Sequence, residues 1–224
     1  MKNTVIFDLD GTILNTLDDL TDAVNFAMRS QNFPEHSAET VKTFVGNGIR
    51  KLIERSVPQH CSNEMLEECF TEFCDYYKEH LNDKTSAYDG IMELLHDLQN
   101  LGFKTAVVTN KADFAAKILC EKIFGDLITV TVGSNDSIKH KPYPDGTLKA
   151  LEILGARAEN AFFVGDSDVD VRTAQNARID FIGVLWGFRD KAVLEGAGAT
   201  VFAKNPQELK ALLTDAKHRI FQKT

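Results

Sequence analysis

Short apolar runs that end in glycine or in polar residues recur along this chain, and their alternation with helical patterns limits the folds that it can adopt. The runs lie at 4–7, 105–108, 127–132, 161–164, 181–185 and 200–202. Runs that are apolar on both faces are typical of strands buried inside a parallel sheet. From residue 91 onward, apolar residues at helical spacing separate the runs, and glycine follows several of these helical patterns. Strand–helix alternation of this kind predicts an α/β fold with a doubly wound parallel sheet.

One segment, residues 17–82, breaks the alternation because it shows helical patterns and no convincing strand. Its apolar stripes lie at 17–27, 41–53 and 65–77, and Gly46-Asn47-Gly48 interrupts the second stripe. We therefore expect an inserted all-helical cap domain that is joined to the core by two hinges. The predicted domains are a core made of residues 1–14 and 86–224 and a cap made of residues 15–85.

Composition and charge narrow the classes of protein. The formal net charge of −8 argues against a nucleic-acid-binding surface, since such surfaces are normally basic. No stretch approaches the length of a membrane span, and the apolar run near the N-terminus is too short for a signal segment. The four cysteines show no C-x-x-C spacing and are expected to be free thiols. We expect a cytoplasmic monomer or homodimer that binds neither nucleic acid nor a membrane.

Acidic and short polar residues follow the predicted strands directly. They are Asp8 and Asp10 after the first strand, Thr109 and Asn110 after the second, Ser134 and then Lys141 after the third, and Asp166, Asp168 and Asp170 after the fourth. Ligands of a doubly wound sheet bind outside the carboxyl ends of its strands, so these side chains should share one rim. Each of them alone could be a turn residue, a helix cap or a solvated lysine, but those roles leave the shared placement unexplained.

The chemistry of this set points to phosphoryl transfer. Crowded carboxylates repel one another unless a cation intervenes, and Mg²⁺ prefers carboxylate, water and phosphate oxygens. An ionised aspartate can be a nucleophile towards phosphorus. A lysine and short polar groups can balance and hold the phosphoryl oxygens. Positioning and neutralisation of charge are what phosphoryl transfer mainly requires.

Four segments, in order along the chain, resemble the motifs of the haloacid dehalogenase superfamily. They are Asp8-Leu9-Asp10-Gly11-Thr12, Val107-Val108-Thr109-Asn110, Lys141-Pro142 and Gly165-Asp166-Ser167-Asp168-Val169-Asp170. The helical insert after the first strand is similar to the C1 cap of this superfamily, and the sheet would be its Rossmann-like core. The second aspartate, Asp10, argues against a dehalogenase, which lacks that residue and the metal. The resemblance therefore implies a phosphatase or a phosphomutase.

The resemblance also implies roles for individual residues. Asp8 would attack the phosphate, and Asp10 would protonate the leaving alcohol and then activate water. Lys141 would orient Asp8 and stabilise the transition state. The Mg²⁺ ligands would be Asp8, the backbone carbonyl of Asp10, and Asp166, with Asp170 supporting this set or holding Lys141. Phosphoryl oxygens would be bound by Gly11, Thr109 and Asn110.

Within the superfamily, residues 11–20 and 44–48 look closest to phosphoglycolate phosphatases, with a departure at Asn15, where such proteins commonly have aspartate. In the cap, Asn47, Gly48 and Arg50 are predicted to contact the substrate, with Arg50 binding a carboxylate. The expected substrate is thus a small phosphomonoester such as 2-phosphoglycolate. Alternatives are a phosphomutase of the β-phosphoglucomutase type, a phosphatase for nucleotides, sugar phosphates or pyrophosphate, and a phosphate-accepting or binding scaffold without catalysis. Receiver domains, which also accept phosphate on aspartate, are about half as long and carry no such cap.

Overall fold

A six-stranded parallel sheet forms the centre of the computed structural model, which describes residues 2–218. The strands are β1 (Thr4–Phe7), β4 (Lys104–Ala112), β5 (Val130–Ser134), β6 (Ala161–Gly165), β7 (Asp180–Val184) and β8 (Phe202–Ala203), in the spatial order β5-β4-β1-β6-β7-β8. The first strand is central and pairs with β4 on one side and β6 on the other. This confirms the predicted doubly wound α/β fold, with each predicted strand present within a few residues of its apolar run.

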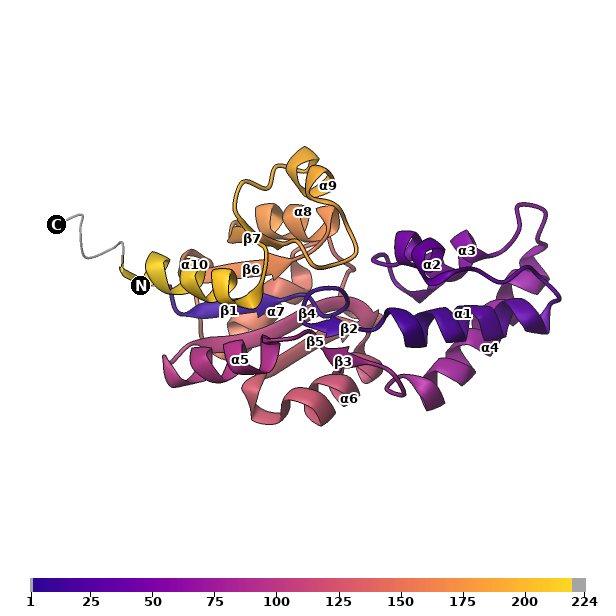
Figure 1. The fold of residues 1–224 in the computed structure, drawn as a ribbon, viewed down its shortest axis with the longest axis horizontal. Coiled ribbons are helices and arrows are strands. Elements are labelled where there is room, and N and C mark those ends of the chain that lie inside the picture. Colours follow the sequence, from indigo (N-terminus) through magenta and orange to yellow (C-terminus); the bar gives the residue numbers. More distant parts are fainter. Residues whose placement is uncertain (1, 219–224) are drawn as a thin grey trace.

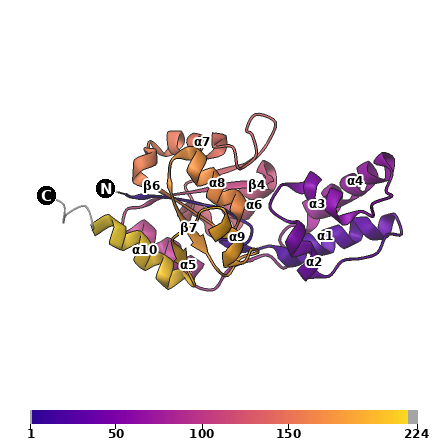
Figure 2. The same cartoon turned by 90° about the horizontal axis from the view of Figure 1, so that it is seen from above.

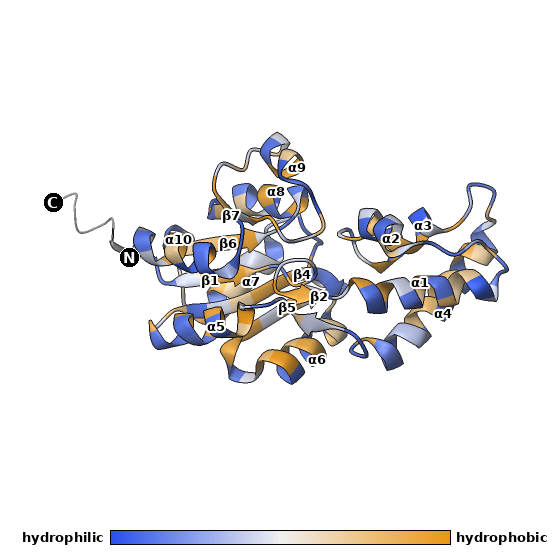
Figure 3. Cartoon of the chain, viewed as in Figure 1, coloured by the Kyte–Doolittle hydropathy of each residue, from blue (hydrophilic) through white to orange (hydrophobic). Residues whose placement is uncertain are grey.

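Helices cover both faces of the sheet, which explains why its strands are apolar on both sides (Figure 2). One face packs against α5 (Ile91–Asn100), α6 (Asp113–Phe124) and α10 (Pro206–His218), and the other against α7 (Asp145–Leu154) and α8 (Asp168–Ala177). Within β1, Val5 and Phe7 belong to the first core and Ile6 to the second, as strand alternation requires. The hydropathy colouring in Figure 3 shows the apolar sheet between helices with polar outer faces. The short α9 (Lys191–Gly196) adds Leu194 to a small cluster beside α8.

The helical insert lies beyond one end of the sheet (Figure 1). It consists of α1 (Leu17–Ser30), α2 (Ala38–Phe44), α3 (Ile49–Ser56) and α4 (Asn63–His80). The predicted interruption at Gly46-Asn47-Gly48 is confirmed, because α2 ends before it and α3 begins after it. The backbone φ angles of Gly46 and Gly48 are +119° and +83°, values that favour glycine.

Two short segments, β2 (Leu14–Asn15) and β3 (Ser86–Ala87), pair antiparallel where the chain enters and leaves the insert. Beside them, the buried Asp19 carboxylate accepts hydrogen bonds from the backbone N–H groups of Lys84 and Thr85 and from the Thr85 hydroxyl. These bonds tie the start of α1 to the returning strand. The crossings lie at the predicted hinges, while the boundaries at residues 15 and 85 stay a prediction.

Two further expectations concern the chain as a whole. All four cysteines are free thiols, as expected from their spacing. Within residues 2–218, no helix is both long enough and apolar enough to cross a membrane.

Candidate active site

A pocket of about 620 Å³, including the solvent at its mouth, lies between the carboxyl ends of the strands and the helical insert. From the core it is lined by predicted site residues, namely Asp8, Asp10, Thr109, Asn110, Lys141 and Asp166. From the insert it is lined by Val45, Gly46, Gly48, Ile49, Leu52 and Tyr77. The structure therefore brings the strand-end residues together at one rim and places the cap over them.

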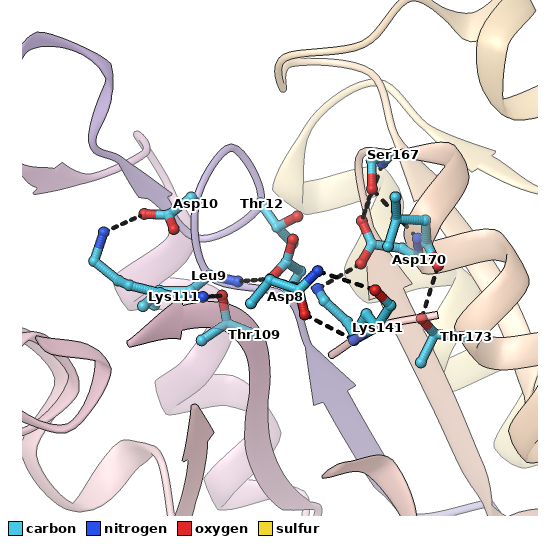
Figure 4. Close-up of polar contacts among 12 residues, drawn as sticks. Asp8, Leu9, Asp10, Thr12, Thr109, Lys111, Lys141, Ser167, Asp170 and Thr173 are labelled. Atoms are coloured by element: carbon cyan, nitrogen blue, oxygen red, sulfur yellow. Dashed lines mark hydrogen bonds and ion pairs between the residues drawn. The ribbon is translucent and has the colours of Figure 1, made fainter. Parts of the chain in front are cut away.

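The Lys141 ammonium bridges two carboxylates at the base of this pocket. Its Nζ lies 2.7 Å from Asp8 Oδ1 and 2.7 Å from Asp170 Oδ1 (Figure 4). Asp170 is fully buried in the first turn of α8, where it forms a capping box with Ser167. Asp170 thus holds Lys141 in place, which is one of the two arrangements that the sequence left open. The same Asp8 oxygen also accepts a hydrogen bond from the Leu9 backbone N–H at 2.7 Å.

Three carboxylates form a compact oxygen-rich cluster. Oxygen atoms of Asp8, Asp166 and Asp170 all lie within 4.8 Å of one another. Burial and the neighbouring Asp170 raise the pKa of Asp8 to about 8, and the same two causes raise the pKa of Asp166 to about 6. A cluster in which each carboxylate opposes the ionisation of the next fits a hard divalent cation, which together with the Lys141 ammonium would balance the three negative charges.

The Asp166 carboxylate lies in a space that is open because Gly11 and Gly187 carry no side chains. This carboxylate accepts hydrogen bonds from the Thr12 hydroxyl at 2.8 Å and from the Phe188 backbone N–H at 2.7 Å. A Cβ atom added to Gly11 or to Gly187 would approach Asp166 Oδ2 to 2.5 Å, so neither position tolerates a side chain without displacing this carboxylate. In this structure Gly11 therefore leaves room for the Asp166 carboxylate of the cluster.

The Asp10 carboxylate lies outside that cluster and faces the insert. Its Oδ1 accepts a hydrogen bond from the Thr16 hydroxyl at 2.7 Å and pairs with the Lys111 ammonium at 2.9 Å. The role of its backbone carbonyl as a cation ligand stays a prediction. In Figure 4 the Asp10 carboxylate points towards the Lys111 ammonium, and Asp10 lines the same pocket as Asp8.

Lys111 is a site residue that the sequence analysis missed. Its side chain is 3% exposed, and it lines the pocket. Burial lowers its pKa, but Asp10 and Tyr77 more than offset this, so the net shift is upward and the ammonium keeps its charge. Lys111 directly follows Thr109-Asn110 in the sequence, which was a usable signal. In the structure β4 continues to Ala112, with a shift in register that turns Lys111 towards Asp10.

Thr109 and Asn110 lie at the rim of the pocket and make different hydrogen bonds. The Thr109 hydroxyl accepts a hydrogen bond from the Lys111 backbone N–H at 3.2 Å. The Asn110 side chain donates to the carbonyls of Gly46 and Lys141 and accepts from the Lys141 N–H at 2.7 Å. It therefore fixes the loop that carries Lys141 and also contacts the cap. A phosphoryl group at Asn110 would meet its backbone rather than its amide.

The cap residues differ from what was expected. Gly48 lines the pocket, but Asn47 and Arg50 are not among the lining residues. The Asn47 side chain accepts a hydrogen bond from Arg55 at 2.8 Å. Arg50 is exposed, and its guanidinium pairs with Glu67 at 2.8 Å. In this structure the Arg50 guanidinium contacts α4 outside the pocket, and a contact with a substrate carboxylate stays a prediction.

Arg189, from the core, reaches the cap in its place. It lines the pocket, and its guanidinium donates to the backbone carbonyls of Lys42, Thr43 and Val45. These hydrogen bonds hold the Arg189 guanidinium against the end of α2 and the residue that follows it. No local sequence pattern marked Arg189, because its partners lie on the other side of the interface between core and insert.

Known proteins share this arrangement. The family model of haloacid dehalogenase-like hydrolases matches residues 5–184. A phosphoglycolate phosphatase of Psychrobacter arcticus is 33% identical over 197 residues, which are 84% of this chain and 85% of that protein. The pyrophosphatase PpaX of Bacillus cereus is 28% identical and spans 95% of this chain and 97% of its own. A phosphoglycolate phosphatase candidate from Lactobacillus delbrueckii subsp. bulgaricus superposes with a TM-score of 0.90 at 31% identity, over 95% of this chain and 99% of that one. With the four motifs converging on one pocket, the chain belongs to the haloacid dehalogenase-like hydrolase family.

Proposed function

We propose that this chain, a phosphatase of the haloacid dehalogenase-like family, is Mg²⁺-dependent and hydrolyses a small phosphomonoester of the 2-phosphoglycolate type through an aspartyl-phosphate on Asp8. The observation that carries the proposal is the placement of Asp8. One of its oxygens is held by Lys141 and by the Leu9 N–H, and its carboxylate faces a pocket into which Asp10 also projects. A nucleophile and an acid–base group thus line one pocket, where in-line attack by Asp8 would leave the departing oxygen on the far side of phosphorus for Asp10 to protonate.

The residues divide the reaction between them. An Asp8 carboxylate oxygen attacks phosphorus, and the bond from phosphorus to the leaving oxygen breaks. Asp10 gives its proton to that oxygen. It later takes a proton from the water that attacks the aspartyl-phosphate, the bond from phosphorus to the Asp8 oxygen breaks, and inorganic phosphate leaves. Lys141, held by Asp170, keeps Asp8 oriented and places positive charge beside the phosphoryl group. Thr109 and the backbone at Gly11 and Asn110 hold phosphoryl oxygens.

Mg²⁺ would be held by Asp8, Asp166 and the Asp10 carbonyl, with Asp170 behind them. When bound, it neutralises the negative charge of the carboxylates and of the phosphoryl oxygens. The chain's own contribution is to bury these groups where water is scarce, which strengthens each electrostatic contact. The proposed cap, residues 15–85, covers the pocket and excludes water from the intermediate.

Relatives support the substrate class. The phosphoglycolate phosphatase of Psychrobacter arcticus makes 2-phosphoglycolate the first candidate. The pyrophosphatase PpaX of Bacillus cereus matches almost the whole chain, so pyrophosphate is the second candidate. Free thiols on all four cysteines fit a reducing compartment, which favours the cytoplasm.

The test is phosphate release from a panel of phosphorylated compounds, with Mg²⁺ or with EDTA, for wild type and Asp8→Asn. The panel includes 2-phosphoglycolate, pyrophosphate, nucleoside monophosphates and β-glucose 1-phosphate. We expect Mg²⁺-dependent release that is greatest for 2-phosphoglycolate and is abolished by Asp8→Asn. Conversion of β-glucose 1-phosphate to an isomer without phosphate release would instead identify a phosphomutase. Release that survives in Asp8→Asn would refute the assignment of the nucleophile.

A further inference from the structure

Three cations line the pocket, and their hydrogen-bonding partners differ. The Lys141 ammonium is shared between two carboxylates, and the Arg189 guanidinium donates to three backbone carbonyls. The Lys111 ammonium has three donors, yet it pairs with a single carboxylate oxygen, Asp10 Oδ1 at 2.9 Å. Of the two lysines of this pocket, Lys111 thus has the larger unused donor capacity.

A buried hydroxyl lies next to that cation. Tyr77 comes from the cap helix α4, is 2% exposed and lines the pocket. Its hydroxyl makes no hydrogen bond of acceptable geometry with the rest of the described chain. The Lys111 ammonium lies 4.9 Å from the centre of the Tyr77 ring, so the two polar groups are neighbours in the pocket. A buried hydroxyl without a partner is costly, so a ligand atom at this point would be stabilised.

The position of this pair relative to Asp10 defines which part of a substrate it can meet. Asp10 is the proposed proton donor to the leaving oxygen, so the leaving group lies beside its carboxylate. Lys111 contacts the same carboxylate and lines the pocket together with Tyr77, so a group of the substrate beyond the leaving oxygen would lie near both. A positive charge and a hydroxyl donor in a water-poor pocket select a negatively charged group there.

We infer that Lys111 and Tyr77 form a subsite for a second anionic group on the leaving-group side of the substrate. This inference rests on the proposed function, since it assumes that Asp10 faces the leaving oxygen. A carboxylate, as in 2-phosphoglycolate, and a second phosphate, as in pyrophosphate, share this chemistry. The pair joins core to cap, because Lys111 lies at the end of β4 and Tyr77 on α4. An anion bound between them links substrate recognition to the cap.

The experiment compares charged and neutral leaving groups. The values of kcat/KM are measured for 2-phosphoglycolate, for pyrophosphate and for ethyl phosphate, whose leaving group carries no charge. Each is measured with wild type, Lys111→Met and Tyr77→Phe. Lys117→Met serves as the matched control, because Lys117 is an exposed lysine of α6 outside the pocket. Binding of 2-phosphoglycolate and of ethyl phosphate to Asp8→Asn, with and without Lys111→Met, is measured calorimetrically with Mg²⁺ present. That second arm needs no turnover.

We expect Lys111→Met to lower kcat/KM for the preferred anionic substrate about 100-fold more than for ethyl phosphate, the scale of a buried charge-assisted hydrogen bond. Tyr77→Phe, which removes only the hydroxyl, should cost about 10-fold on the anionic substrate and leave the fold intact. Preference for 2-phosphoglycolate identifies the anion as a carboxylate, and preference for pyrophosphate identifies it as a phosphate.

Equal losses for charged and neutral substrates in both variants would overturn the subsite and leave Lys111 as a partner that only positions Asp10. Wild-type protein that does not favour either anionic substrate over ethyl phosphate would overturn it as well. Failure of the proposed function has a different signature, because phosphate release would then persist in Asp8→Asn or be absent from every compound. In that case the calorimetric arm still decides, since loss of discrimination between the two ligands in Lys111→Met supports the subsite and unchanged discrimination refutes it.

Discussion

The carboxylate cluster should make the metal-free protein less stable as pH rises, and Mg²⁺ should reverse this effect. In the folded protein the pKa of Asp8 is raised to about 8 from an ordinary 3.8, and its side chain is only 12% exposed. A raised carboxyl pKa contributes stability below the unfolded value, and this contribution is lost as pH climbs towards the folded value. Each pH unit in that window costs about 1.4 kcal/mol. Between pH 5 and pH 7 Asp8 alone therefore lowers the free energy of unfolding by about 3 kcal/mol.

Asp166 adds to the loss at the acidic end of this window, because its pKa is raised to about 6. For a domain of this size the Asp8 contribution corresponds to a fall of roughly 6–12 °C in Tm. Since Mg²⁺ binds the ionised carboxylates, its stabilising effect should grow from pH 5 to pH 8. The assay is thermal unfolding followed by circular dichroism at several pH values, in EDTA and in excess Mg²⁺.

Asp8→Asn isolates the effect from other titrating groups, because it keeps the side-chain shape and removes the charge. In EDTA the stability of wild type relative to Asp8→Asn should decline from pH 5 to pH 8. A relative stability that is flat or that rises over this range would refute the reasoning. So would a shift in Tm on adding Mg²⁺ that is no larger at pH 8 than at pH 5.

Three further substitutions test particular contacts. Gly187→Ala should lower Mg²⁺ affinity at least about 10-fold, because a new Cβ would displace Asp166, and calorimetric titration with Mg²⁺ measures this. Asp19→Ala should lower the free energy of unfolding by about 2–4 kcal/mol, because it leaves two backbone N–H groups of the returning linker unpaired, and urea denaturation would show it. Arg50→Ala should change kcat/KM less than about twofold, because the exposed ion pair of Arg50 with Glu67 contributes little. A large rise in KM would instead mean that the arginine moves into the pocket when the cap closes.

The predictable parts of this molecule are those governed by local pattern. Short apolar runs predict strands because a strand buried on both faces must be apolar throughout. The residues after Phe7, Val108 and Gly165 converge because parallel strands end at the same edge of a sheet. Their convergence follows from topology, and topology follows from the alternation of strands and helices.

Contacts between core and cap were not predictable in the same way. Lys111 meets Asp10 across 101 positions of sequence, and Tyr77 joins them from a third segment. Nothing local separates such a buried lysine from one that begins a helix. Helical periodicity does not settle Arg50 either, because it lies three residues before the buried Ile53 and its partner Glu67 belongs to another helix.

The central claim is that Asp8 carries the phosphoryl group, and the most direct test is to trap it there. Asp10→Asn should accumulate the intermediate with p-nitrophenyl phosphate, because this leaving group needs little protonation while the attacking water loses its base. Acid quenching, borohydride reduction and peptide mass spectrometry then locate the modified residue. The account predicts homoserine at position 8, dependent on Mg²⁺ and absent from Asp8→Asn. Phosphate release without any reducible adduct at position 8, or an adduct at another aspartate, would contradict it.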